Sequence, residues 1–229
     1  MQILMNTGGI AATNCFLVAD EEAKQAVLFD APDHTAGPLL GEAERRGWDV
    51  VGLWLTHGHF DHVADHVVVT KRNPRAKVLI HKLDEPKLLR PKENLPPIFQ
   101  LLPITIPGGR ADGYLEDGQK LSIGALELEV IFTPGHAPGH VMFYFPKEKL
   151  LIGGDLIIGG AVGRTDLPDS DPVALDASIR RVMQLPPDTR LLPGHGELST
   201  LGEEREMNPY VRGAMGLNGG IERDRGPNE

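Results

Sequence analysis

The stretch Val50–His62, VVGLWLTHGHFDH, joins an apolar run to a cluster of histidines. The run Val50–Thr56 is almost continuously apolar, which is typical of a strand buried on both faces. Four side chains that can bind a metal follow within six residues: His57, His59, Asp61 and His62. Because residues two apart in an extended loop face the same side, His57 and His59 can approach one ion together. We interpret the cluster as a metal site rather than as a polar loop with solvated histidines.

Three later positions repeat this arrangement, in which an apolar strand ends and a glycine lies beside a metal-binding side chain. They are His136 in TPGHAPGH after Leu126–Thr133, Asp155 at the end of Leu150–Asp155, and His195 in PGHG within Arg190–Gly196. A strand end holds a ligand rigidly, and glycine lets the backbone pass close to the site. A lone histidine is more often a surface or core residue than a ligand, so the ordered set carries the prediction.

The order HxHxDH, His, Asp, His resembles the metallo-β-lactamase superfamily, and the resemblance extends from about Asn14 to Val211. It implies an α/β (α+β) fold, an αββα sandwich of two mixed β-sheets flanked by helices, with the site at one edge between the sheets. It also implies that His57, His59 and His136 hold one metal. Asp61, His62 and His195 would then hold the second, with Asp155 bridging both.

The implied cofactors are two divalent metal ions; these donors suit zinc, and iron or manganese tolerates them as well. Two ions about 3.5–4 Å apart share a bridging water, whose pKa falls towards 7. We therefore expect hydrolysis of a thioester or ester by attack of a metal-bound hydroxide. Asp61 and Asp155 are the expected catalytic carboxylates: Asp61 orients the nucleophile and takes its proton, and Asp155 bridges the ions.

Two further segments, GRTDLP (Gly163–Pro168) and HGELSTLGEEREMNP (His195–Pro209), resemble compact glyoxalase II-like (hydroxyacylglutathione hydrolase-like) enzymes, which cleave thioesters such as S-lactoylglutathione. The chain departs from that pattern in two ways. Almost nothing follows Arg212, where glyoxalase II carries a helical domain. The lysine and tyrosine of the KxY pattern of glyoxalase II are replaced here by Arg164 and Asp166.

We expect Arg164 to contact a carboxylate of the substrate. The alternative is that Arg164 and Asp166 pair with each other and only shape the loop. His140, close to His136 in sequence, is expected to contact the substrate or to support a ligand from behind.

Two other functions stay open. The GRTD segment also resembles the persulfide dioxygenases, in which the equivalents of His57, His136 and Asp155 bind one iron for oxygen chemistry. The third interpretation is a metal-binding scaffold without catalysis.

Secondary-structure patterns predict a hairpin from Asn14–Ala19 and Ala26–Ala31, followed by further strands and interspersed helices. The predicted helices are Gly37–Arg46, Val63–Arg72 and Pro172–Gln184, and Leu83–Gly109 predicts a short helix followed by a surface loop. No change in composition marks a linker, so we expect a single domain over residues 1–212 and a mobile tail over residues 213–229.

Composition narrows the partners of this chain of 229 residues. Its 32 acidic and 23 basic residues give a net charge of −9, which argues against nucleic acid and membrane surfaces as partners and leaves a small-molecule substrate. The single cysteine, Cys15, excludes an internal disulfide and suits a reducing compartment. Because no secretory signal or membrane span is recognisable, we expect a cytoplasmic protein, with its oligomeric state left open.

Overall fold

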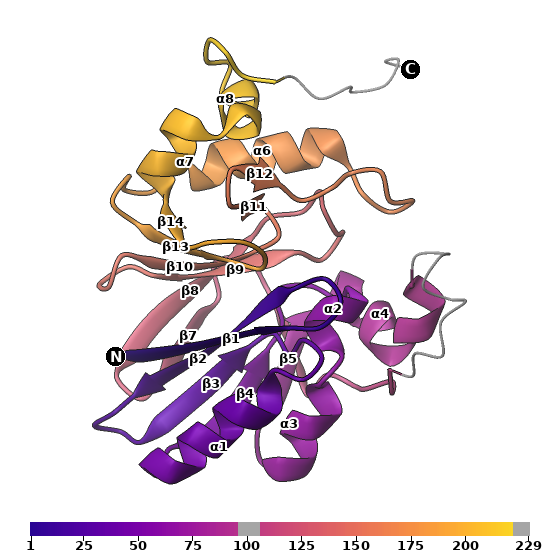
Figure 1. The fold of residues 1–229 in the computed structure, drawn as a ribbon, viewed down its shortest axis with the longest axis vertical. Helices are drawn as coiled ribbons and strands as arrows, with labels where there is room; N and C mark the ends of the chain where they lie inside the picture. Colours follow the sequence, from indigo (N-terminus) through magenta and orange to yellow (C-terminus); the bar gives the residue numbers. More distant parts are fainter. Residues whose placement is uncertain (96–105, 222–229) are drawn as a thin grey trace.

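Two six-stranded sheets pack face to face in the computed structural model, which describes residues 1–95 and 106–221 (Figure 1). The first sheet has the order β1 (Gln2–Gly8), β2 (Thr13–Asp20), β3 (Gln25–Phe29), β4 (Asp49–Trp54), β5 (Lys77–His81), β6 (Gly113–Leu115). The second has the order β14 (Ser199–Thr200), β13 (Arg190–Pro193), β10 (Leu150–Gly154), β9 (Val141–Phe145), β8 (Leu126–Phe132), β7 (Lys120–Ile123). Both sheets mix parallel and antiparallel pairs. A short hairpin, β11 (Ile157–Ile158) and β12 (Ala161–Val162), follows β10.

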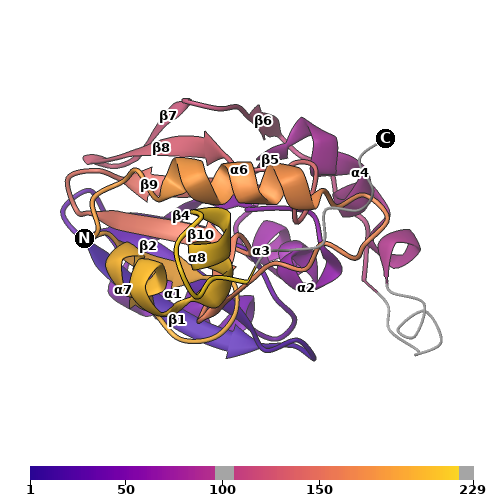
Figure 2. The ribbon, with the colours of Figure 1, turned by 90° about the horizontal axis from the view of Figure 1, so that it is seen from above.

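Helices cover the two outer faces (Figures 1 and 2). The first sheet is covered by α1 (Ala36–Arg46) and α3 (His66–Arg72), and the second by α6 (Pro172–Val182), α7 (Leu201–Met207) and α8 (Pro209–Ala214). The short helices α2 (Phe60–Val63) and α4 (Glu85–Leu89) lie side by side, with 3-10 turns at Lys82–Asp84 and Pro91–Asn94. The layers are therefore helix, sheet, sheet, helix, which confirms the predicted αββα sandwich.

Aromatic side chains fill the space between the sheets. Phe29 of β3 meets Phe143 of β9 edge to face with ring centroids 4.9 Å apart, and meets Trp54 of β4 at 5.6 Å. All three belong to one buried cluster that includes residues of both sheets. Burying each such side chain stabilises the fold by about 1.5–3 kcal/mol relative to exposure. This packing holds the two sheets against one another.

The structure confirms the predicted hairpin as β2 and β3, but the predicted helix Val63–Arg72 is wrong at its start. The chain turns between α2 and α3, where Asp65 donates its N–H to the Ala31 carbonyl at 2.7 Å. The Asp65 carboxylate also accepts the N–H of Ala36 at 3.1 Å. These contacts with a distant segment replace a continuous helix.

The segments predicted to be irregular are described in part. The short helix expected after Leu83 is α4, whereas residues 96–105 of the loop that follows lie outside the described residues. Of the expected tail, the structure describes residues 213–221, where Ile221 donates its N–H to the Pro209 carbonyl at 2.8 Å. A mobile tail stays a prediction. Within the part of the chain that is described, none of the helices has the length and apolar character needed to span a bilayer.

Asp20, the last residue of β2, connects the two sheets through hydrogen bonds to backbone N–H groups. Its Oδ1 accepts the N–H of Glu22 and its Oδ2 accepts the N–H of Ala125, at 3.0 and 2.7 Å. The hydrogen bond from Ala125 lowers the pKa of Asp20, with the N–H groups of Ala23 and Glu22 adding to the effect. A lowered pKa in the folded state contributes stability above the unfolded value of about 3.9, and that stability is lost as pH falls through the folded pKa.

We therefore expect Asp20→Asn to lower the melting temperature at neutral pH. The difference from the wild type should narrow as pH falls below about 4, because the wild-type carboxylate is then protonated as well. Thermal melts of the two proteins across this range measure the effect. A difference that is constant at all pH values would show that the charge of Asp20 plays no part.

Candidate metal centre

All seven predicted ligands meet at one place, where strands of both sheets end. His57 and His59 lie on the loop after β4, while Asp61 and His62 belong to α2. From the second sheet come His136 on the β8–β9 loop, Asp155 directly after β10, and His195 after β13. Their ligating atoms form overlapping groups within which all atoms lie within 4.8 Å of one another.

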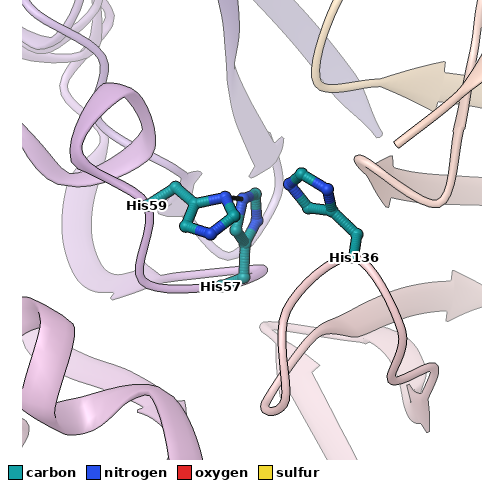
Figure 3. Close-up of side chains that lie close together, drawn as sticks. All are labelled: His57, His59 and His136. Atoms are coloured by element: carbon teal, nitrogen blue, oxygen red, sulfur yellow. Dashed lines mark hydrogen bonds between the residues drawn. The ribbon is translucent and has the colours of Figure 1, made fainter. Parts of the chain in front are cut away.

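His57, His59 and His136 form what we call the first ligand group. Figure 3 shows that His57 and His59 come from one loop and that the ring of His136 approaches them from another. His57 Nε2 lies 3.1 Å from His59 Nδ1, and the ring centroids of His59 and His136 are 4.5 Å apart. Three imidazole nitrogens therefore face one point, as the sequence predicted for the first metal.

Asp61, His62 and His195 form the second ligand group. Asp61 Oδ2 lies 3.3 Å from His195 Nε2 and 3.7 Å from His62 Nε2. The hydroxyl of Thr13 donates to the same Asp61 oxygen at 2.9 Å. This group offers one carboxylate and two imidazoles, as predicted for the second metal.

Asp155 lies between the two groups. Its Oδ2 is 3.5 Å from His136 Nε2 in the first group and 3.2 Å from His195 Nε2 in the second. Its Oδ1 is 3.4 Å from His62 Nε2. One carboxylate therefore contacts both groups, which is the position that the predicted bridging ligand requires.

Hydrogen bonds on the far side of each ring orient the histidines. His136 Nδ1 donates to the carbonyl of Arg164 at 2.9 Å, and His195 Nδ1 donates to the carbonyl of Ala11 at 3.1 Å. A carbonyl only accepts, so Nδ1 carries the hydrogen and a neutral ring presents the lone pair of Nε2. Such outer contacts fix both the tautomer and the direction of a metal-binding histidine.

Asp30, which the sequence interpretation missed, orients one histidine in each group. It is buried at the end of β3 with φ at 60°, and its Oδ2 accepts from His62 Nδ1 at 2.8 Å. It also accepts the N–H and the hydroxyl of Thr56, both at 2.8 Å, and that hydroxyl lies 3.0 Å from His57 Nδ1. The sequence did contain a signal for Asp30, because AVLFD ends an apolar strand with a carboxylate, as the segment that ends in Asp155 does.

Electrostatics in the cluster favour bound cations. Burial lowers the pKa of His57 and His59 well below the usual value, so both are neutral, as a ligand must be. Burial opposes the charge of His195, but hydrogen bonds to Asp155 and Asp61 outweigh it and raise its pKa to about 10. Burial would raise the pKa of Asp61, but the charge of His62 and the hydrogen bond from His195 lower it to about 2. The carboxylates thus attract positive charge into this space.

Unsatisfied polar atoms test whether the cluster fits metal ions. Three buried atoms in it make no hydrogen bond: His62 Nε2, His136 Nε2 and Asp155 Oδ1. Each such atom costs about 1–3 kcal/mol when left unsatisfied. Coordination would satisfy all three, and nitrogen and oxygen donors of this kind suit zinc, iron and manganese. The residues therefore fit two divalent cations.

The two residues predicted to bind substrate lie in different surroundings. His140 is fully buried; its Nδ1 lies 2.8 Å from the Thr133 hydroxyl, and its Nε2 accepts the N–H of Asp155 at 2.9 Å. Of the two roles expected for His140, this position favours support of a ligand from behind. The side chain of Arg164 is 58% exposed and pairs with Asp166 through two contacts of 2.5 and 2.6 Å. The Arg164–Asp166 pair that the alternative interpretation requires is thus present, and substrate binding by Arg164 stays a prediction.

A cavity of about 290 Å³ opens beside Asp61 of the second ligand group. Apolar side chains form much of its wall, with Asp33 as a further carboxylate; its lining residues are Gly9, Ile10, Asp33, Phe60, Asp61, Ala64 and Ile106. The metal centre therefore borders a space in which part of a small molecule can lie.

Comparison with known proteins identifies the family. The model of the metallo-β-lactamase superfamily matches residues 8–195 of this chain. The chain belongs to the metallo-β-lactamase superfamily. Most members of this superfamily are metal-dependent hydrolases, and the assignment agrees with the sandwich and with the order of the ligands.

Three relatives illustrate where the chain lies within the metallo-β-lactamase superfamily. It is 32% identical to the hydroxyacylglutathione hydrolase GloC of Haemophilus influenzae over 86% of this chain and 92% of that protein. The crystal structure of the BLEG-1 B3 metallo-beta-lactamase superposes with a TM-score of 0.84 at 32% identity, covering 93% of this chain and 100% of that one. TTHA1623 in a di-iron-bound form gives a TM-score of 0.78 at 38% identity, covering 90% and 99%.

Proposed function

We propose that this protein is a dinuclear metal-dependent hydrolase that cleaves a thioester or ester, as hydroxyacylglutathione hydrolases do. The observation that carries the proposal is the pair of ligand groups joined by Asp155, whose Oδ2 lies within 3.5 Å of a histidine nitrogen in each. The identity to GloC, a hydroxyacylglutathione hydrolase by name, supports the thioester as the bond that is cleaved.

Different residues of the chain have different roles in the proposed hydrolysis. Two divalent ions held there would supply a water of lowered pKa and an electrophile for the scissile carbonyl. Asp61, fixed by the Thr13 hydroxyl, is placed to orient the attacking water and accept its proton. The apolar wall of the cavity, with Ile10 and Phe60, is placed to receive the acyl group beside this carboxylate.

The decisive experiment measures metal content and activity on the same samples of purified protein loaded with zinc, iron or manganese. The assays are cleavage of S-lactoylglutathione, cleavage of a carboxylic ester, and oxygen uptake with glutathione persulfide. Two ions per chain together with thioester cleavage would support the proposal. One iron with oxygen uptake would support the dioxygenase instead, and fully loaded protein that cleaves no thioester or ester would refute hydrolysis of these bonds.

The role of Arg164 has its own test. If its guanidinium contacts an anionic substrate, Arg164→Ala should raise KM for S-lactoylglutathione by about threefold to tenfold with little change in kcat, the pattern of lost uniform binding. Asp166→Ala should lower KM, because it releases the guanidinium from its partner. Arg45→Ala, an exposed residue that pairs with Glu42 on α1, serves as control. An unchanged KM in both loop variants would leave Arg164 and Asp166 with a role in loop structure alone.

A further inference from the structure

A buried carboxylate outside the ligand set connects the two loops of the first ligand group. Asp84, at the end of the 3-10 turn before α4, is fully buried. Its Oδ2 accepts the N–H of Gly58 at 2.8 Å, and its Oδ1 accepts the N–H of Gly139 at 2.7 Å. Gly58 lies between His57 and His59, and Gly139 lies on the loop that carries His136. One side chain therefore spans the gap between the two sheets at the metal centre.

Both loops approach Asp84 more closely than any side chain permits. A Cβ atom on Gly58 would lie 2.7 Å from the Asp84 carbonyl oxygen and 2.8 Å from the Cβ of Lys87. A Cβ atom on Gly139 would lie 2.8 Å from the Asp84 nitrogen. Only glycine therefore allows both loops to lie this close to Asp84, and the two hydrogen bonds to its carboxylate hold them at this spacing.

Lys87 balances the buried charge and connects a third segment. Its Nζ lies 3.8 Å from Asp84 Oδ1 and 2.6 Å from Asp169 Oδ2, and only 8% of its side chain is exposed. Asp169 follows Arg164, whose carbonyl orients His136. A buried carboxylate needs such a partner, because an unpaired buried charge is strongly destabilising. Asp84, Lys87 and Asp169 thus link the segments that position the first ligand group.

We propose that Asp84 is a positioning residue that sets the distance between His136 and the His57–His59 loop, and hence the affinity of the first ligand group for its ion. The second ligand group has other supports, namely Asp30 behind His62, Thr13 beside Asp61 and the Ala11 carbonyl behind His195. Loss of Asp84 should therefore weaken one ion and spare the other. This inference rests on the metal centre of the proposed function but not on its substrate.

The test is Asp84→Asn, which keeps the shape but turns an NH₂ group toward one of the two N–H donors. Competition with a chelator measures the zinc affinities, and elemental analysis measures the ion content. The absorption spectrum of the cobalt form compares the arrangement of the ligands in the variant and the wild type. We expect the affinity for one ion to fall by about tenfold to a hundredfold and the other to stay unchanged. After dialysis against the chelator, the variant should retain one ion where the wild type retains two.

Asp20→Asn is the matched control, because it also removes a carboxylate that accepts backbone N–H groups, at the opposite end of β2 from Thr13, which contacts the metal centre. It should keep both ions. If Asp84→Asn is unfolded without metal, Asp169→Asn is the milder variant, because it releases Lys87 from its exposed partner. It should lower the affinity for the same single ion by a few fold. Equal loss of both ions, or no loss of either, would overturn the inference. A wild type that binds two ions but cleaves no ester or thioester would refute the proposed function and leave this inference standing.

Discussion

Asp155→Ala is expected to lower kcat/KM for thioester hydrolysis by about a thousandfold or more. The reason is its position, since its two oxygens contact His136 in the first ligand group and both His62 and His195 in the second. Removing it takes a ligand from both ions and leaves neighbouring histidines without a counter-charge. Ion content should fall below two per chain, because an incomplete ligand set binds more weakly. Steady-state kinetics and elemental analysis on the same preparation measure both effects.

Asp188→Ala is the control for this substitution, because it removes an exposed carboxylate that pairs with Lys149 in a surface contact. It should retain both ions and full activity. Asp155→Asn should be almost as inactive as the alanine variant, since an amide carries no charge and has a single acceptor oxygen. An active Asp155→Ala protein that has lost its metal would refute metal-dependent hydrolysis at this centre.

Gly194→Ala is expected to disable the same centre by adding one methyl group. A Cβ atom at this position would lie 2.2 Å from Asp155 Oδ1 and 2.8 Å from His62 Cε1. His62 cannot move aside freely because its Nδ1 is held by Asp30. The methyl group must therefore displace the Asp155 carboxylate, and a shift of about 1 Å can cost about a hundredfold in rate. We expect at least that loss in kcat/KM, together with a loss of bound ion.

Gly41→Ala provides the matched control for Gly194→Ala. Gly41 lies within α1, where an added Cβ meets no atom within 4 Å. Alanine there should stabilise the helix by about 0.5–1 kcal/mol and leave activity unchanged. Thermal melts, ion content and kinetics of both variants separate damage to the fold from damage to the site. Full activity with two bound ions in Gly194→Ala would contradict the close packing that the structure shows.

The sequence predicts secondary structure well where the local pattern is strong. It does not predict the elements whose local pattern is weak or whose order comes from contacts with distant segments. The strand β1 was not predicted, because MQILMNTG shows no strict alternation and its pairing with β2 supplies the order. The helix α7 was also missed, although Thr200 and Glu203 form a capping box that its sequence displays. The interruption between α2 and α3 depends on Ala31 and Ala36, which lie far from it in the sequence.

The sequence by itself predicted the family, the sandwich and the seven candidate metal ligands, because all seven follow the ends of apolar strands, five of them next to a glycine, and such local patterns are written in consecutive residues. Only the tertiary structure decided how these side chains are held. Asp84 contacts Gly58 and Gly139, which are 26 and 55 residues away, and Asp30 contacts His62, 32 residues away. A single carboxylate shows no pattern of its own, so its partners become known only when folding brings distant backbone N–H groups and rings within hydrogen-bonding distance.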